Sequence, residues 1–280
     1  MKRRLLLTLA AALLLTGAMP TSVAGRKKKK KVVVDDYYAN LPQPDAPMPD
    51  LTPQPHLSEV LLAGQKPLLP QQLRQNTHTA NRSIGGIDVS HYQGTINWRE
   101  VAQERNIQYV YIKATEGTQL VDDTYRTNLR GARKAGLRVG SYHFFNPNAN
   151  AREQFRNFST VVKVKEQDLI PIIDIEHRGK SPLPEFQNRL RQFLQMVERH
   201  YGVRPVLYTS RDFYNKYLSG PFTHYKYMIA RYHPDIPQLC DNAAFVMWQY
   251  SATSRIRGIR GNVDRSCMID HYTLSDILMR

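Results

Sequence analysis

Two acids, Asp174 and Glu176, end an apolar run in the 280-residue chain, IPIIDIEH at residues 170–177. The isoleucines around them are typical of a buried strand. Because side chains alternate along a strand, both carboxylates point to the same side, with Cβ atoms about 6.6 Å apart. Two carboxylates on one face are costly to bury unpaired, so the pair is a candidate for acid–base chemistry. The same pattern also fits helix capping or pairing with His177 or Arg178.

Apolar runs recur from about residue 83 onward, and helical segments separate the earlier ones. The predicted strands are 83–91, 108–117, 137–145, 168–177, 204–210, 225–232, 244–251 and 261–267. Helices are predicted at 124–135, at 149–162 and, most clearly, at 183–201, where apolar residues recur every three or four positions. Strands that alternate with helices indicate a parallel sheet. We therefore expect an α/β fold, an irregular TIM-like (β/α) barrel of about eight strands whose last strands lack full helices. An open doubly wound sheet is the alternative.

Acids and aromatic residues gather at the predicted carboxyl ends of these strands. The side chains at the strand ends are Asp88, Ser90, His91, Lys113, Glu116, Tyr142, His143, Asp174, Glu176, Tyr208, Arg231, Tyr232, Trp248, Gln249 and Asp264. In a barrel, the carboxyl ends of the strands converge on one mouth. Aromatic rings stack on sugar faces, and carboxylates do acid–base work on a glycosidic bond. The set predicts a carbohydrate-active site at that mouth.

Six motifs in this region resemble the lysozymes of glycoside hydrolase family 25. They are GIDVSHYQGTINW (86–98), IKATEG (112–117), GSYHFF (140–145), PIIDIE (171–176), WQYS (248–251) and GIRGNVD (258–264). The resemblance covers about residues 84–270. It implies an irregular barrel and hydrolysis of the β-1,4 bond between N-acetylmuramic acid and N-acetylglucosamine in peptidoglycan.

The resemblance also implies roles for individual residues. By motif match, Glu176 is the general acid/base and Asp174 its partner. The other expected site residues are the acids Asp88 and Asp264, and the substrate-binding residues Tyr142, Tyr208, Trp248 and Glu116. Glu116 could instead only organise the loop after its strand, and His91 and His143 are expected to be oriented by hydrogen bonds. Lys113 is expected to pair with an acid at the rim. After Asp264 the sequence Arg265-Ser266-Cys267 departs from the family, which commonly has Asn two positions after the acid.

The spacing of Asp174 and Glu176 does not choose between inversion and retention. We favour, as a hypothesis, a third route in which the N-acetyl group of the substrate attacks and Asp174 stabilises it. A non-hydrolysing peptidoglycan-binding module is the alternative function, and the presence of all four acids favours the enzyme. A chitin-cleaving relative would have the strand pattern D-x-x-D-x-D-x-E, whereas residues 167–176 are QDLIPIIDIE.

The first 82 residues differ from the rest in composition. Residues 1–24 have the basic, apolar and small-residue regions of a signal peptide, which predicts export to the periplasm, the envelope or the medium. An uncleaved membrane anchor is the alternative. Residues 25–82 comprise the basic run Arg26–Lys31 and a Pro-rich linker, both expected to be largely disordered, and residues 83–280 form the predicted catalytic domain.

The charge and the cysteine content limit which binding partners and cofactors we expect. The formal charge is 39 − 24 = +15, and six of the bases lie in Arg26–Lys31. That run could bind an anionic envelope surface or be a solvated tail. Nucleic acid is not expected, because the domain lacks interleaved basic and aromatic residues. Cys240 and Cys267 fit one disulfide or two unrelated thiols. The two cysteines form no metal-binding motif. We expect no cofactor, and we favour a monomer.

Overall fold

The structure is a computed structural model of the chain, which describes residues 78–241 and 243–279. The strands are β1 (Ala80–Val89), β2 (Ile107–Glu116), β3 (Leu120–Val121), β4 (Arg138–Phe144), β5 (Ile172–Asp174), β6 (Val206–Ser210), β7 (Lys226–Ala230), β8 (Met247–Ser254) and β9 (Val263–Ile269). The helices are α2 (Trp98–Val101), α3 (Tyr125–Lys134), α4 (Ala151–Val161), α5 (Leu183–Tyr201) and α6 (Arg211–Phe213). Shorter or irregular turns are η1 (His91–Gln93), η2 (Val164–Glu166), η3 (Tyr214–Leu218) and η4 (Leu274–Asp276).

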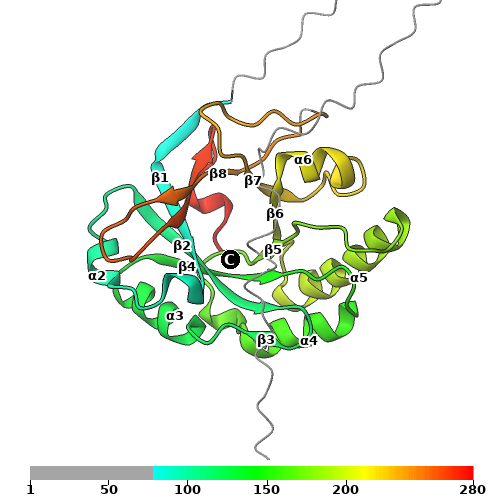
Figure 1. Ribbon diagram of the computed structural model, residues 1–280, viewed down its shortest axis with the longest axis horizontal. Helices are drawn as coiled ribbons and strands as arrows, with labels where there is room; N and C mark the ends of the chain where they lie inside the picture. The colour runs from blue at the N-terminus through cyan, green and yellow to red at the C-terminus, as the bar shows by residue number, and fades with distance from the viewer. Residues whose placement is uncertain (1–77, 242, 280) are drawn as a thin grey trace, which may run out of the picture. The chain divides into compact units, whose positions relative to one another are not determined.

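Eight of the strands form a closed barrel (Figure 1). The order is β1-β9-β8-β7-β6-β5-β4-β2, and β1 closes the ring by pairing with β2, while β3 is a short addition to the edge of β2. All neighbours in the ring are parallel except β9, which runs antiparallel to both β1 and β8. The predicted TIM-like α/β barrel is confirmed, but the prediction that its sheet is parallel throughout is wrong at β9. The eight residues that join β8 to β9 are too few for the crossover that a parallel pair needs.

Helices cover the outside of the first part of the barrel (Figure 1). α5 has the predicted bounds, and α3 and α4 lie within the ranges predicted for them. α5 is followed by Gly202, whose φ of 71° is a left-handed conformation that glycine adopts without strain. Beyond β6, only α6 and the irregular turn η3 follow before β7, and no helix of the described residues connects β7 to β8 or β8 to β9. The late strands therefore lack full helices, as expected.

Alternation along the strands separates two apolar cores. The outward faces pack with the helices in a large outer core that includes Ile87, Ile112 and Ile173. The inward faces form a smaller inner core that includes Tyr109, Tyr111 and Met268. The two tyrosines fit inside because glycines lie beside them: a Cβ on Gly86 would come within 2.1 Å of the Tyr109 ring, and one on Gly140 within 2.4 Å of Tyr111.

The end of the chain closes the floor of the barrel. The N–H of Ile170 donates to the carbonyl of Ile277 at 2.7 Å, and the N–H of Met279 donates to the carbonyl of Asp168 at 2.9 Å. Ile277 is fully buried in the inner core. The mouth at the other end is therefore the end at which a ligand can reach the inward faces.

The fold changes one expectation about a strand, decides one alternative that the sequence left open, and leaves the first residues of the chain untested. The strand predicted at 168–177 is regular only over Ile172–Asp174, because its first residues pair with the end of the chain and Pro171 has no N–H to donate. Cys240 and Cys267 are both free, the first exposed and the second buried, so of the two alternatives left open by the sequence the structure shows two unrelated thiols. The predicted signal peptide, basic run and most of the linker lie outside the described residues. Across 78–241 and 243–279, no helix has the length and apolar character that membrane crossing requires.

Candidate active site

The fold brings the four predicted catalytic acids to the mouth. Asp88 is the penultimate residue of β1, and its backbone is directly opposite Asp264 in the ladder between β1 and β9. Asp174 ends β5, and Glu176 follows two residues later. The segment between them is held on both sides: Phe145 donates its N–H to the Asp174 carbonyl, and Ile175 donates to the Tyr208 carbonyl, each at 2.9 Å.

Asp264 reaches the mouth by a different route from the other acids. We expected it at the carboxyl end of its strand, but it is the second residue of β9. Because β9 runs antiparallel to its neighbours, the start of this strand lies where the parallel strands end. The position of the acid is as predicted, and the strand direction that places it there is not.

Asp174 and Glu176 both have raised pKa values. Burial and, to a smaller extent, the charge of Glu176 raise the pKa of Asp174 well above its ordinary value. Burial and, to a smaller extent, the charge of Asp264 raise the pKa of Glu176 to about 7. A side-chain hydrogen bond joins the two carboxyl groups. A carboxylic acid that keeps its proton near neutral pH can serve as a general acid.

The remaining two acids also have raised pKa values. Burial and the charge of Asp264 raise the pKa of Asp88 to about 8, against a weaker opposing effect of a hydrogen bond from Gln249. Burial raises the pKa of Asp264 to about 6. The mouth therefore concentrates carboxyl groups that resist ionisation together, which is common at catalytic sites.

Lys113 pairs with Glu116, which confirms that it pairs with an acid at the rim. Its Nζ lies 2.7 Å from Glu116 Oε2, and the lysine side chain is almost fully buried. The same ammonium opposes the rise in the pKa values of Asp174 and Glu176. The structure thus shows Glu116 in contact with the cation that lowers the pKa values of Asp174 and Glu176.

Gln249 was named from the sequence among the strand-end side chains but was given no role in the site. The hydroxyls of Tyr208 and Tyr232 both donate to its Oε1 at 2.8 Å, and its Nε2 donates to Asp88 Oδ2 at 3.1 Å. Only 2% of Gln249 is exposed. The amide therefore fixes two aromatic hydroxyls and one acid relative to one another.

The predicted aromatic residues fall in two groups. Tyr142 and Tyr208 lie near the acids. Burial, with the charges of nearby carboxylates that include Asp174, raises the pKa of both hydroxyls. Trp248 does not join them: it is 1% exposed, packs in the outer core, and donates its Nε1–H to the carbonyl of Arg231 at 2.9 Å. Successive side chains of β8 alternate, so Gln249 takes the inward position. Alternation alone separates the two side chains, and because β8 contains no acid, the sequence does not mark which of them faces the site.

The two histidines have the hydrogen-bonded positions that we expected. His91 contacts Asp122 Oδ2 through both its backbone N–H and its Nδ1, each at 2.9 Å. His143 is buried, with Nδ1 2.8 Å from Thr115 Oγ1, and burial lowers its pKa to about 3. A neutral, buried imidazole on the outward face of β4 orders the core behind the site.

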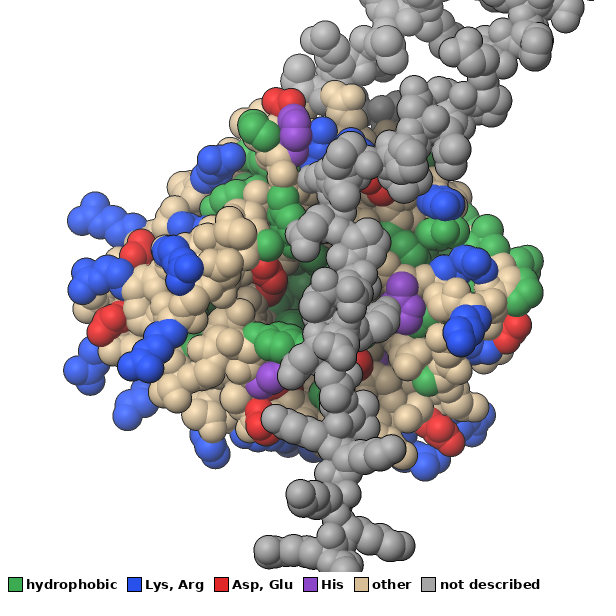
Figure 2. All heavy atoms as spheres, viewed as in Figure 1, with side chains coloured by type: hydrophobic (Ala, Val, Ile, Leu, Met, Phe, Trp, Pro, Cys, Tyr) green, Lys and Arg blue, Asp and Glu red, His purple; other side chains and the backbone are tan. Residues whose placement is uncertain are grey.

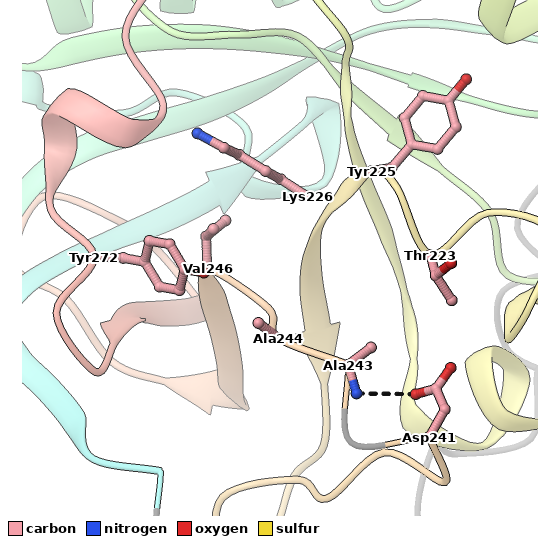
Figure 3. A pocket seen from close by; sticks show the side chains of 8 residues that line it. All are labelled: Thr223, Tyr225, Lys226, Asp241, Ala243, Ala244, Val246 and Tyr272. Carbon is pink, nitrogen blue, oxygen red and sulfur yellow. Dashed lines mark hydrogen bonds between the residues drawn. The ribbon is translucent and has the colours of Figure 1, made fainter.

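A cavity of about 410 Å³ lies away from the acids, near the start of β7 and before β8 (Figure 3). Asp241 is held at its edge, where Oδ1 accepts the N–H of Ala243 at 3.0 Å. The lining side chains are Thr223, Tyr225, Lys226, Asp241, Ala243, Ala244, Val246 and Tyr272. None of the four acids lines it. Within 78–241 and 243–279, no cluster of three or more His, Cys, Asp or Glu residues could hold a metal ion.

A model of the family described as Glycosyl hydrolases family 25 matches residues 87–259, which span the strands and loops that carry most of these residues. The chain belongs to glycosyl hydrolase family 25. It is 38% identical over 189 residues to the uncharacterized protein YegX of Escherichia coli strain K12, covering 66% of this chain and 69% of YegX. It is 32% identical over 197 residues to Lysozyme M1 of Streptomyces globisporus, covering 65% and 67%.

Solved structures agree with the family assignment. The structure of a family 25 glycosyl hydrolase from Bacillus anthracis superposes with a TM-score of 0.61 at 30% sequence identity. It covers 66% of this chain and 88% of that one. The family 25 chain is accordingly a glycoside hydrolase with an irregular TIM-like barrel.

Proposed function

We propose that this family 25 hydrolase is an exported N-acetylmuramidase, a lysozyme that cuts the β-1,4 bond between N-acetylmuramic acid and N-acetylglucosamine in peptidoglycan. Glu176 is the general acid/base and Asp174 its partner. Lysozyme M1 is similar over two thirds of its length, which supports the same substrate class for this chain.

One observation carries the proposal. Asp174 Oδ1 is buried and has no hydrogen-bond partner in the described part of the chain, although the acid lies beside a carboxyl group whose pKa is raised to about 7. An unpaired buried acceptor is costly unless a ligand satisfies it. The N–H of a substrate acetamido group is a donor of suitable chemistry, and both sugars of peptidoglycan carry one.

The reaction follows from this arrangement. Glu176 donates its proton to the glycosidic oxygen as the bond from that oxygen to C1 breaks. The acetamido carbonyl oxygen attacks C1, and Asp174 accepts a hydrogen bond from the acetamido N–H as positive charge develops on that group. Water then attacks C1 while Glu176 takes one proton from that water. This step opens the five-membered ring that the acetamido oxygen had formed with C1, and it restores both the acetamido group and the acid.

The other residues of the mouth support these two acids. Asp264 helps to keep Glu176 protonated through its charge, and Gln249 holds Asp88 and Tyr208 in place. Tyr142 and Tyr208 offer rings to the sugars. Trp248 supports the site from the outer core, because its ring is buried on the opposite face of β8.

Digestion of purified peptidoglycan tests the reaction. The full chain is compared with Glu176→Gln and with the control Glu153→Gln, which removes an exposed acid of α4. We expect fragments with muramic-acid reducing ends from the wild type and the control, and a large loss with Glu176→Gln. Binding of the glycan without cleavage by the wild type would instead identify a binding module.

The substrate-assisted route and the export are tested separately. Retention of the anomeric configuration is expected in the first product, and a substrate without the acetamido group should resist cleavage. An inverted product, or equal cleavage of that substrate, contradicts the route. Mass measurement of the mature chain should show loss of residues 1–24, and an intact start would contradict cleavage of the signal.

A further inference from the structure

Three arginines stand on the loop that joins β8 to β9, residues 255–262, which we call the arginine loop. Arg255, Arg257 and Arg260 are all exposed. No hydrogen bond or ion pair to another described residue involves their side chains, whereas Arg126, Arg133 and Arg189 are each paired with an acid. Their charges are therefore available to a ligand.

The arginine loop is held in place by buried residues of its own and by a backbone hydrogen bond. Ile256 and Ile259 are 5% and 9% exposed and belong to the outer core. Between them, Gly258 accepts the N–H of Asn97 at 2.8 Å and has a φ of 89°, and a Cβ there would come within 2.5 Å of the Asn97 carbonyl oxygen. Buried isoleucines that alternate with arginines hold the charged residues on the solvent side.

The arginine loop lies at the rim of the candidate active site. It leads directly into Val263 and Asp264, and on its other side it continues β8, which carries Gln249. The Nε2 of Gln93 donates to the carbonyl of Asn262 at 3.2 Å, so the loop also contacts η1, which follows Asp88 and its strand. Figure 2 shows Lys and Arg side chains gathered along the left edge of the view, the side on which Figure 1 labels α2.

We propose that the arginine loop binds carboxylates of the peptide stems of peptidoglycan while the glycan lies in the mouth. This inference rests on the proposed function. Stems branch from the muramic acid residues and carry carboxylates beside the glycan, and guanidinium groups bind carboxylates with paired hydrogen bonds. A rim loop is placed to reach such side groups, whereas the acids in the mouth are placed to reach the sugars.

Other anionic partners fit the loop less well. Membrane insertion needs apolar side chains that face outward, and both isoleucines of residues 255–262 are buried. Single-stranded nucleic acid needs aromatic rings on which bases stack, and the sequence SRIRGIRGN at 254–262 contains none. Binding of substrate carboxylates requires neither outward apolar side chains nor aromatic rings.

A kinetic comparison on two substrates tests the proposal. The variant is Arg255→Gln/Arg257→Gln/Arg260→Gln in the full chain. The matched control, Arg105→Gln/Lys134→Gln/Arg138→Gln, removes three exposed charges before β2 and at the start of β4, at the opposite end of the barrel. The substrates are intact peptidoglycan and peptidoglycan whose stem carboxylates have been converted to neutral amides.

On intact peptidoglycan we expect the variant to raise KM roughly 5- to 30-fold with little change in kcat, because exposed ion pairs contribute modestly and together. The control should match the wild type. On the amidated substrate, variant and wild type should have the same KM, and the wild type should lose its salt dependence.

Three outcomes would overturn the inference. An unchanged KM of the variant on the intact substrate would remove any role for the loop. An equal rise in KM on both substrates would show that the loop contacts the glycan and not the carboxylates. A variant that loses only its binding to vesicles of anionic phospholipid would assign the loop to a membrane surface. Failure of the wild type to cleave either substrate would be a failure of the proposed function itself.

Discussion

Asp264 and Met268 lie four residues apart on the inward face of the same strand, yet their surroundings differ. Met268 is fully buried in the inner core at the floor, where the polar groups are paired: Tyr109 contacts Ser266 at 3.0 Å and Tyr111 donates to the Ile170 carbonyl at 3.1 Å. Asp264 lies at the mouth, among acids with raised pKa values and an unpaired buried oxygen of Asp174.

Under the proposed function, the floor contributes stability and the mouth contributes the chemistry. Packing of apolar side chains and paired hydroxyls stabilises the barrel, whereas clustered buried carboxyl groups reduce its stability and raise one another's pKa values. Substitutions at the floor should therefore change the free energy of unfolding and spare turnover. Substitutions of the acids at the mouth should instead lower turnover and leave the free energy of unfolding unchanged or higher.

The largest effect is expected for Glu176→Gln. Loss of a general acid lowers kcat by about 10²- to 10⁴-fold, which corresponds to roughly 3–5 kcal/mol of transition-state stabilisation. Because the amide is nearly the same size, the midpoint of urea unfolding should be unchanged or higher. A variant that loses activity and stability together would show that Glu176 also supports the fold.

The matching change at the floor is Met268→Ala. Truncation of a fully buried methionine should cost about 2–5 kcal/mol in the free energy of unfolding, measured in urea. At a temperature where the variant stays folded, kcat should lie within a few-fold of the wild type. A large loss of kcat in the folded variant would contradict the separation of floor from mouth.

Asp88→Asn should stabilise the protein in a pH-dependent way. The pKa of Asp88 is about 8 in the folded chain against an ordinary 3.8, so the folded state binds its proton more tightly than the unfolded state. The resulting cost is absent below about pH 4, grows as the pH rises from about 4 to about 8, and is constant above that.

At pH 8.5 the asparagine variant should melt at least about 2–4 °C higher than the wild type, because about 1 kcal/mol gives that rise in a domain of this size and the shift of Asp88 corresponds to more. At pH 4 the two should melt together. An equal gain at both pH values would mean that ionisation of Asp88 is not the cause.

The smallest effect is a shift of the pH profile with Asp264→Asn. The charge of Asp264 helps to raise the pKa of Glu176 to about 7, so removing it should lower that pKa. The alkaline limb of kcat/KM should move to lower pH by about 0.5–1 unit. Glu153→Gln is the control, and a limb that stays in place or moves upward would contradict the electrostatic role of Asp264.

The sequence by itself determined the local features. The bounds of α5 follow from its apolar spacing, and the placement of Asp174 and Glu176 on one face follows from alternation within a single short segment. The convergence of Asp88, Asp174 and Asp264 on one mouth was also foreseen, because a barrel gathers strand ends. Each of these depends on contacts within one element or on a general property of the fold class.

Only the tertiary structure decided which face of each strand looks inward and in which direction the last strand runs. Alternation predicts that Trp248 and Gln249 point to opposite sides, but ring closure decides that Gln249 faces the acids. The antiparallel course of β9 likewise depends on its pairing with both β1 and β8, and the separation of Cys240 from Cys267 depends on the packing of distant segments. These features come from contacts between residues far apart in the chain, and no local pattern of residue types encodes them.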